Sequence, residues 1–476
     1  MDERIPVRNP RNGEIDYHIE RPQPPVLDAL SAGLRAAQPA WAALGPERRG
    51  EIVGAFAASA AGAPALLEAL ATDTGRRLIS QVEVQSLPGM AARWAAAAPR
   101  LLADAGERAS LTPGVWIRDQ LLPYPLVGVI SPWNFPLLLS MIDALPALMA
   151  GCAVLVKPSE VTPRFAEPLN ALIGEFPELS GVFRFLPGDG RTGAAVIERV
   201  DALAFTGSVR TGRLVARACA ERFIPAFLEL GGKDPCIVLP SADLDTAVKI
   251  VLRASVQATG QACQSLERIY VPAERHDEFV RRLVQAADAL EFNYPDIGRG
   301  HLGPLIFARQ AEIISAHLED AVAKGARVLT GGQIETHGGG CWIRPTVVVD
   351  VNHDMLLMRE ETFGPVIPVM AYRDIDEAVA LANDSDYGLS AAVIGADEAE
   401  CLALARRLDA GAVSINDAGL TTEVHDATHD AFGYSGMGAS RMGDSGLMRY
   451  LRRKALMIRR GEVRGMESRD ERLAGG

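Results

Sequence analysis

Apolar positions along this chain follow two different patterns. Near the start they recur at helical spacing, which predicts helices over 25–44 and 47–72. From about residue 125, short apolar runs alternate with helical stretches such as 163–175 and 209–222. The runs lie at 127–130, 153–157, 182–186, 202–205 and 227–230. Apolar strands separated by helices are typical of parallel sheets, so this part of the chain predicts an α/β domain.

The same alternation restarts after Gly231, which predicts a second α/β domain. Its predicted strands lie at 235–239, 267–271, 327–329, 366–372, 391–394 and 412–416. Its predicted helices lie at 243–258, 275–290, 308–324, 375–383 and 397–409. At the chain ends, the Arg11-Asn12-Gly13 turn predicts a hairpin, and the charged stretch 461–476 predicts a loose tail.

The stretch 121–156 is apolar and long enough to span a bilayer. It contains five prolines and Asp143, however, and a membrane helix with so many breaks would leave backbone groups unpaired in lipid. We therefore interpret it as two buried strands that flank a short helix. The first ten residues lack the apolar segment of a secretory signal.

Composition narrows the function. The chain has 476 residues, of which 48% are hydrophobic, which is enough for several large cores. Its net charge of −12, without a basic stripe, argues against nucleic acid as a partner because phosphates would be repelled. None of the six cysteines forms a CxxC pair, a usage typical of the reducing cytoplasm, where we expect the protein.

Two polar groups follow predicted strands of the first domain. Lys157 and Glu160 come at a strand's carboxyl end, where doubly wound sheets bind ribose hydroxyls, although a surface turn explains them equally well. Ser208, between Gly207 and Gly212, begins a helix and could bind a phosphate. The spacing is not GxGxxG, so a simple helix cap remains open.

Three further residues could carry out chemistry. Glu229 ends a strand before two glycines, so it is either a solvated strand end or a general base. Asn134, between Trp133 and Phe135, is either a turn residue or an amide donor to an oxyanion. Cys263, in 260-GQAC-263, is either a small buried hydrophobe or a nucleophile.

Taken together, these motifs resemble the aldehyde dehydrogenase superfamily. PWNFP, KPSE, FTGS, ELGGK, GQAC and EETFGP occur in that order, and the resemblance runs from about residue 8 to 460. It implies a Rossmann-like parallel-sheet cofactor domain, a second α/β catalytic domain and a small β oligomerisation arm. The implied boundaries are 1–107 and 125–229 for the cofactor domain, 230–440 for the catalytic domain, 108–124 and 441–460 for the arm, and 461–476 for a flexible tail.

The resemblance also implies a reaction, the oxidation of an aldehyde to its acid with NAD or NADP. Cys263 would be the nucleophile that forms a thiohemiacetal and then a thioester, Glu229 would activate water, and Asn134 would hold the oxyanion with the Cys263 N–H. Ser208 would contact the pyrophosphate, and Glu361 would contact the nicotinamide ribose. The implied cofactor-binding residues are Trp133, Lys157, Ser159, Glu160, Gly207, Ser208, Gly231, Glu361 and Phe363, and no metal is expected.

Two residues refine this expectation. Relatives that transfer the acyl group to coenzyme A lack the ELGGK glutamate, so Glu229 favours hydrolysis over the coenzyme A-acylating alternative. Glu160 should repel a 2′-phosphate, so NAD is expected, with NADP possible. A third hypothesis is that the protein has kept the fold of the family but is not catalytic. The aldehyde is not specified, although Leu138, Leu139 and Ile142 predict a partly apolar tunnel.

Two departures from the family pattern stand out. Many relatives carry a lysine nine residues after the PWNFP asparagine, where this chain has Asp143, and the reversed charge puts the proton path in question. In the substrate-access region, His425 and His429 are four residues apart beside aspartates; we expect a solvated loop or a contact with a polar substrate rather than a metal site.

The expected assembly is a homodimer or homotetramer. In the family, the arm and a late strand, here 455–459, pair between subunits, and the apolar alternation of that strand fits an edge that needs a partner.

Overall fold

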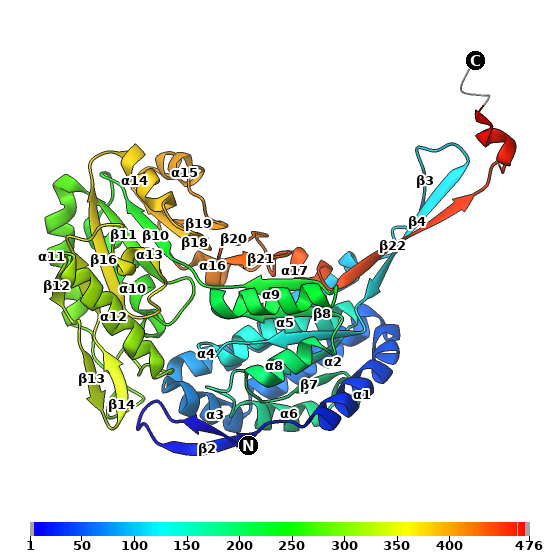
Figure 1. Cartoon of the computed structure of the whole chain (residues 1–476), viewed down its shortest axis with the longest axis horizontal. Coiled ribbons are helices and arrows are strands. Elements are labelled where there is room, and N and C mark those ends of the chain that lie inside the picture. Colours follow the sequence, from blue (N-terminus) through cyan, green and yellow to red (C-terminus); the bar gives the residue numbers. More distant parts are fainter. Residues whose placement is uncertain (1–3, 464, 472–476) are drawn as a thin grey trace.

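The computed structural model describes residues 4–463 and 465–471, which fold into two α/β bodies and a projecting arm (Figure 1). The predicted fold class is confirmed. The predicted tail lies partly outside the described residues; within them, Met466–Arg469 forms a short 3-10 turn.

The first body contains a six-stranded sheet. In spatial order its strands are β21 (Gly436–Met437), β9 (Ala226–Glu229), β8 (Ala202–Thr206), β5 (Leu126–Ile130), β6 (Ala153–Lys157) and β7 (Phe183–Phe185). The five strands from β9 to β7 are parallel, as predicted, whereas β21 is an antiparallel edge strand. Residues 436–437 therefore belong to the first sheet, although we expected 230–440 to form the second domain.

Helices surround this sheet. They are α1 (Pro24–Ala43), α2 (Gly45–Ala61), α3 (Pro64–Thr74), α4 (Arg77–Leu101), α5 (Pro136–Ala150), α6 (Ala166–Gly174), α7 (Pro177–Ser180), α8 (Gly190–Ile197) and α9 (Val209–Glu221). The single helix predicted for 47–72 is wrong, because α2 ends at Gly62 and Pro64 starts a new helix. Helix α4 was not predicted, since Pro88 and Pro99 lie inside it and proline disfavours helices.

The second body contains a seven-stranded, mostly parallel sheet. Its strands in spatial order are β12 (Arg327–Thr330), β15 (Thr346–Val349), β16 (Val366–Tyr372), β11 (Leu266–Pro272), β10 (Asp234–Val238), β18 (Ser390–Ile394) and β19 (Ala412–Ile415). Along β10, Cys236 and Val238 pack into one core, while Ile237 packs into another on the opposite face. Burial on both faces explains why the strands read as continuous apolar runs.

Helices and small elements complete the second body. The helices are α10 (Leu244–Val256), α11 (His276–Asp288), α12 (Arg309–Ala323), α13 (Leu356–Arg359), α14 (Ile375–Asn383), α15 (Glu398–Ala405) and α16 (Leu420–Glu423), with the 3-10 turns η1 (Gln257–Gly260) and η2 (Ala273–Arg275). The small strand pairs are β13 (Ile334–His337) with β14 (Gly340–Ile343), and β17 (Tyr387–Gly388) with β20 (Phe432–Gly433). The hairpin predicted at the start of the chain is β1 (Arg4–Arg8) and β2 (Ile15–Glu20).

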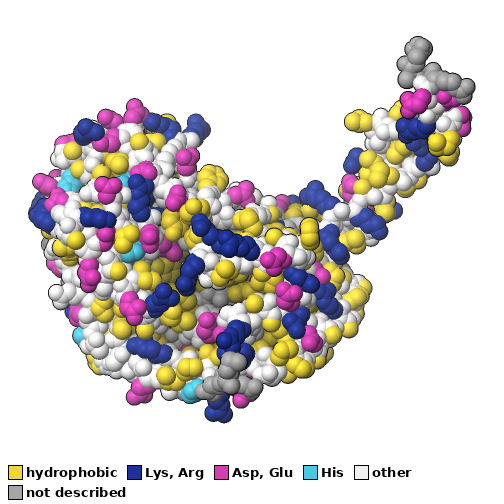
Figure 2. Space-filling model, in the orientation of Figure 1, with side chains coloured by type: hydrophobic (Ala, Val, Ile, Leu, Met, Phe, Trp, Pro, Cys, Tyr) yellow, Lys and Arg dark blue, Asp and Glu magenta, His cyan; other side chains and the backbone are white. Residues whose placement is uncertain are grey.

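The arm is a three-stranded antiparallel sheet that points away from both bodies (Figure 1). Its strands, from one edge to the other, are β22 (Leu451–Arg459), β4 (Val115–Pro123) and β3 (Glu107–Ala109). The late part of the arm begins at residue 451 rather than 441, because α17 (Ser445–Met448) packs against α5 of the first body. Figure 2 shows apolar side chains along the arm. Met457 on β22 is 74% exposed.

The apolar stretch 121–156 folds as predicted, with β5 and β6 flanking α5. Among the described residues, no single helix is long and apolar enough to cross a membrane; the pair α2 and α3 passes only together and is bent by 65°.

Candidate active site

The loop that carries Cys263 has an unusual backbone. Ala258, Thr259 and Gly260 all have positive φ, at 57°, 59° and 68°. Left-handed conformations at non-glycine residues cost energy and are retained where the surroundings enforce them. Here the surroundings do so: a Cβ on Gly260 would lie 2.2 Å from the carbonyl carbon of Gly364, so this turn packs directly against the EETFGP segment.

Gln261 fixes the same loop. Its side-chain Nε2 donates to the carbonyls of Ala258 and Pro304, both at 3.1 Å, and its Oε1 accepts from the Ile306 N–H at 2.9 Å. All three bonds are buried, so they hold the loop strongly. Cys263, two residues later, is half-buried.

Asn134 lies against this loop. It follows β5, it is buried, and its Nδ2 donates to the Gln261 carbonyl at 3.0 Å. The Asn134 carbonyl in turn accepts from the buried guanidinium of Arg76. The amide that the sequence singled out is therefore next to the Cys263 loop, although 127 residues separate Asn134 from Gln261.

Glu229 and the glycines after it border the same space. The carbonyl of Glu229 accepts from the Gly207 N–H at 3.1 Å, and β21 pairs with Glu229 from the other side. A Cβ on Gly232 would lie 2.5 Å from the Cys263 carbonyl oxygen, so only glycine lets the two loops approach. The Glu229 side chain is 20% exposed, which leaves it accessible to water.

The thiol of Cys263 is protonated at rest. Burial and the nearby Glu361 carboxylate raise its pKa to about 12, while Arg441 acts in the opposite direction. Burial likewise raises the pKa of Glu361, to about 8. The Glu361 carboxylate accepts from the Gly232 N–H at 3.1 Å and fills the space beside Gly231.

The predicted cofactor residues gather at the carboxyl ends of β5, β6 and β8. Lys157 is buried and pairs with Glu160 at 2.8 Å. Ser208 caps the thirteen-residue helix α9 by accepting from the Thr211 N–H at 3.4 Å. In the same region Ser159 accepts from the Val161 N–H at 3.2 Å.

The two predicted aromatic cofactor residues meet. Trp133 and Phe363 pack edge to face, with ring centroids 5.4 Å apart. Phe363 has a positive φ of 54°, and its N–H donates to Glu267 at 2.8 Å. A cation beside a carboxylate and a helix N-terminus at the carboxyl ends of parallel strands, with this aromatic pair, fit a dinucleotide.

Glu267 and Lys233 hold the EETFGP segment in place. Glu267 accepts from the N–H groups of Thr362 and Phe363, both at 2.8 Å, and it pairs with the buried ammonium of Lys233. Lys233 also reaches the Thr362 hydroxyl at 3.2 Å. The ELGGK lysine therefore ties the loop after Glu229 to the segment that carries Glu361.

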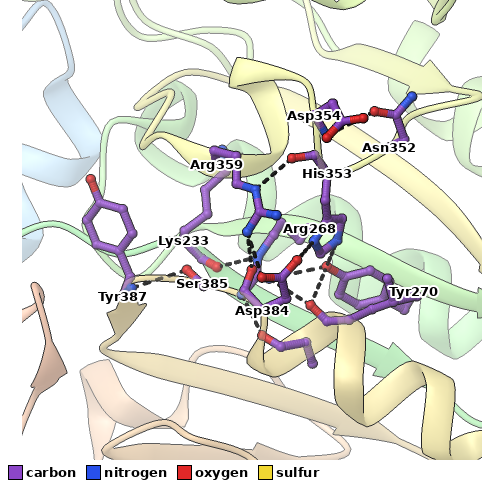
Figure 3. A network of polar contacts seen from close by, with 12 residues as sticks. Lys233, Arg268, Tyr270, Asn352, His353, Asp354, Arg359, Asp384, Ser385 and Tyr387 are labelled. Carbon is purple, nitrogen blue, oxygen red and sulfur yellow. Dashed lines mark hydrogen bonds and ion pairs between the residues drawn. The ribbon is translucent and has the colours of Figure 1, made fainter.

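A second network lies behind this segment (Figure 3). Arg268 donates to the Lys233 carbonyl at 2.8 Å. Arg359 pairs with Asp384 at 2.7 Å, and the His353 ring contacts the same aspartate at 2.7 Å. Because Arg359 is two residues before Glu361, the network anchors the segment to the second sheet.

Asp143 is neither exposed nor alone. Its side chain, 1% exposed, accepts from Arg441 at 3.0 Å and from Arg449. The Nε of Arg441 lies 3.4 Å from Glu229 Oε1. The aspartate therefore does not face Glu229 as a bare negative charge, as its sequence position suggested, because a guanidinium contacts both carboxylates.

The histidine loop contains no cluster of possible metal ligands. Within 4–463 and 465–471, no group of three or more His, Cys, Asp or Glu side chains could hold a metal ion. His429 contacts the Ala427 carbonyl at 3.1 Å, and burial beside Arg93 lowers the pKa of His425. The AFGYSGMG stretch, in contrast, forms β20 and β21, and its Ser435 carbonyl accepts from the Leu230 N–H at 2.8 Å.

The sequence did not reveal the supporting residues of the site. Glu83 accepts from the N–H groups of Leu137 and Leu138 and so caps α5, directly after Asn134. Arg76, Arg441 and Glu267 also act across large sequence separations. None of these residues lies in a local sequence motif. The one available signal is a charged residue inside an apolar stretch, such as Asp143, because a buried charge needs a buried partner.

Comparison with known proteins identifies the family. The model of the aldehyde dehydrogenase family matches residues 1–456. The chain belongs to this family. The solved structure of PutA from Anabaena variabilis has a TM-score of 0.94 and 49% identity, covering 97% of this chain and 99% of PutA.

Two further members of the aldehyde dehydrogenase family bear on the cofactor. A Mycolicibacterium smegmatis relative named for succinate semialdehyde and NADP+ is 38% identical over 394 residues, 82% of this chain and 76% of the relative. Betaine aldehyde dehydrogenase from Staphylococcus aureus, solved with NAD+, has a TM-score of 0.90 and 27% identity, covering 97% and 93% of the two chains. The protein is an NAD(P)-dependent aldehyde dehydrogenase.

Proposed function

We propose that this aldehyde dehydrogenase converts its aldehyde to the free acid through a thioester on Cys263 that Glu229 hydrolyses. The observation that carries the proposal is the convergence of three loops: Asn134 on Gln261, Gly232 on the Cys263 carbonyl, and Gly260 on Gly364.

The first step is addition of the Cys263 sulfur to the aldehyde carbonyl. The S–H bond breaks and its proton passes to solvent water, a C–S bond forms, and the electron pair of the C=O π bond moves to oxygen as an alkoxide. The Cys263 N–H and the free N–H of the Asn134 amide would stabilise the alkoxide, and such a donor typically contributes about 3 kcal/mol. Asn134 already has one N–H on Gln261, which fixes the direction of the other.

The second step removes a hydride from the thiohemiacetal carbon and leaves a thioester on Cys263. NAD(P), when bound, accepts this hydride. Lys157, Glu160 and Ser208 would hold the adenosine and phosphate portions, while Trp133, Gly207, Gly231, Glu361 and Phe363 would border the rest.

The last step is hydrolysis. Glu229 takes a proton from water, the hydroxide adds to the thioester carbon, and the C–S bond breaks to release the acid and the thiolate. A partly exposed carboxylate beside the Cys263 loop has the position that this step needs.

The mechanism predicts different failures for two variants. Cys263→Ala should abolish NADH formation, since no covalent adduct can form. Glu229→Gln should still produce NADH in the first turnover but slow the steady state at least about tenfold, because hydrolysis loses its base. Stopped-flow absorbance at 340 nm separates the two phases. Full steady-state activity of either variant would refute the mechanism; Cys341→Ala, the other half-buried cysteine, should behave as wild type.

The same assay settles the finer points. A panel of aliphatic, aromatic and semialdehyde substrates with each cofactor identifies the aldehyde and tests the preference for NAD, which rests on Glu160 beside Lys157. Product formation that depends on coenzyme A would instead favour an acylating enzyme.

A further inference from the structure

The strongest unexplained feature near the active site is a buried cluster of charges behind Glu229. It consists of two carboxylates, Asp143 and Glu229, and two guanidiniums, Arg441 and Arg449. The side chains of Asp143 and Arg449 are each 1% exposed, and that of Arg441 is 8% exposed. Burying four charges is costly, so each must be balanced by a partner.

Within the cluster, Asp143 holds both arginines by hydrogen bonds, whereas the Nε of Arg441 makes no hydrogen bond. Asp143, two turns into α5, accepts from both arginines. Arg441 also donates to the Thr206 hydroxyl on β8, the strand beside β9. These bonds use one end of the Arg441 guanidinium, and its Nε is left buried without a hydrogen bond, 3.4 Å from Glu229 Oε1.

That distance has a chemical meaning. A charge-assisted N–H···O bond is about 2.7 to 2.9 Å long and would occupy the carboxylate. At 3.4 Å the guanidinium attracts the Glu229 carboxylate through its charge without a hydrogen bond between them. Arg441 also favours the thiolate of Cys263, against Glu361, Asp234 and Glu229.

We propose that Arg441 is the positioning residue of Glu229: it orients the general base, and Asp143 is its anchor. This inference rests on the proposed hydrolytic function. It explains why an aspartate is acceptable at a position where many relatives carry a lysine: the cation near Glu229 is supplied by another element of the chain, and Asp143 holds it there.

Arg449 provides a matched control. It donates to the other oxygen of Asp143, but its remaining bonds go to the Tyr450 hydroxyl and the Ala439 carbonyl, and its guanidinium stacks on the Phe227 ring. Its charge acts on Glu229 without the close contact that Arg441 makes. If the arginines only neutralise Asp143, replacing either one should have the same effect. If Arg441 acts through Glu229, its replacement should slow hydrolysis far more than that of Arg449.

The test compares Arg441→Met, Arg441→Lys and Arg449→Met with wild type, using the panel aldehyde of highest kcat/KM. For Arg441→Met, the steady-state rate at pH 7 should fall at least about tenfold more than the first turnover, since deacylation needs a correctly oriented Glu229. Arg441→Lys should recover part of this selective loss, because it restores the positive charge.

The charged groups around Glu229 and Cys263 in this experiment are Arg441, Arg449, Asp143, Asp234 and Glu361. Arg449→Met should slow the steady state relative to the first turnover much less than Arg441→Met does. Equal selective losses in Arg441→Met and Arg449→Met, or no selective loss in Arg441→Met, would overturn the proposal. A wild type that forms no acid, or a Cys263→Ala variant that stays active, would instead refute the proposed function.

Folding could obscure the result, since Arg441→Met leaves a buried aspartate with one partner. The double variant Asp143→Asn/Arg441→Met removes one charge of each sign and leaves Glu229 with Arg449. It should show the same slow hydrolysis with a melting temperature nearer that of wild type. If neither variant folds, the cluster is structural and the proposal is wrong.

Discussion

At the scale of single residues, the reactive groups are not in their reactive states. The Cys263 thiol has a pKa raised to about 12, and Glu361 has a pKa raised to about 8 by burial. Both effects share a cause, since charge is disfavoured in a buried space with several carboxylates. At neutral pH the thiol form of Cys263 is therefore favoured over the thiolate, which makes the group less reactive in the ligand-free protein.

This protection predicts how Cys263 is alkylated. In the ligand-free enzyme, iodoacetamide should react slowly at pH 7, and the rate should rise about tenfold per pH unit up to pH 9, because only the thiolate reacts. Glu361→Gln should speed alkylation at pH 9, where Glu361 with its pKa of about 8 is ionised, since the variant removes a negative charge that raises the thiol pKa. Glu360→Gln, an exposed neighbour, should not. Peptide mass spectrometry measures the rate at Cys263, and a plateau below pH 8 would contradict the raised pKa.

At the scale of elements, the site depends on loops rather than on the strands and helices that precede them. The turn at 258–260 is left-handed at three successive residues, and Gly260 sits on Gly364 without space for a side chain. Through this contact the loop of the nucleophile packs directly on the segment of Glu361. The segment is further held by Glu267 and Lys233.

Gly260→Ala tests this coupling. A Cβ would lie 2.2 Å from the Gly364 backbone at a positive φ, so the turn must shift. We expect a loss of turnover of at least about tenfold and a lower melting temperature, because positive φ is strained for alanine. Gly33→Ala in α1 is the control, because nothing lies within 4 Å of the Cβ that alanine would add. This variant should raise the free energy of unfolding by about 0.5–1 kcal/mol. Wild-type kinetics in Gly260→Ala would show that the two loops are independent.

Some elements of the fold could be predicted from the sequence, and others could not. Strands such as β6 and β10 were predictable, because burial on both faces produces a continuous apolar run. Motif residues such as Cys263 were recognisable because each sits in a local signature. Helix α4 was not, since its prolines oppose the helix that packing enforces, and neither was the pairing of Asp143 with Arg441, 298 residues away. Long-range charge pairs leave no periodic trace in a sequence.

At the scale of the whole molecule, the candidate site lies where the two sheets meet. The first sheet supplies Glu229 and the second is flanked by the loops of Cys263 and Glu361, so the chemistry depends on how the two bodies are held together. Residues from the last hundred reinforce the junction: β21 pairs with β9, and Arg441 contacts Glu229 from beyond β21.

The arm projects from both bodies as a sheet of its own (Figure 1). Its strand β22 is hydrogen-bonded to β4 along its whole length but lies at the edge of the three-stranded sheet, and Leu456 and Met457 on it are exposed. Exposed apolar side chains on an edge strand favour association with another chain. We therefore propose that the arm joins subunits into a dimer or tetramer.

Met457→Asp should disrupt that assembly, because a charge placed in an apolar interface loses its hydration without gaining a partner. Light scattering after size exclusion should then report a smaller species than wild type. Leu78→Asp on α4 is the control: Leu78 is 73% exposed, against 74% for Met457, but it lies on the first body. It should leave the mass unchanged. A wild-type protein that runs as a monomer at micromolar concentration would refute the role of the arm, and because the active-site residues named above all lie outside the arm, first-turnover NADH formation should survive Met457→Asp.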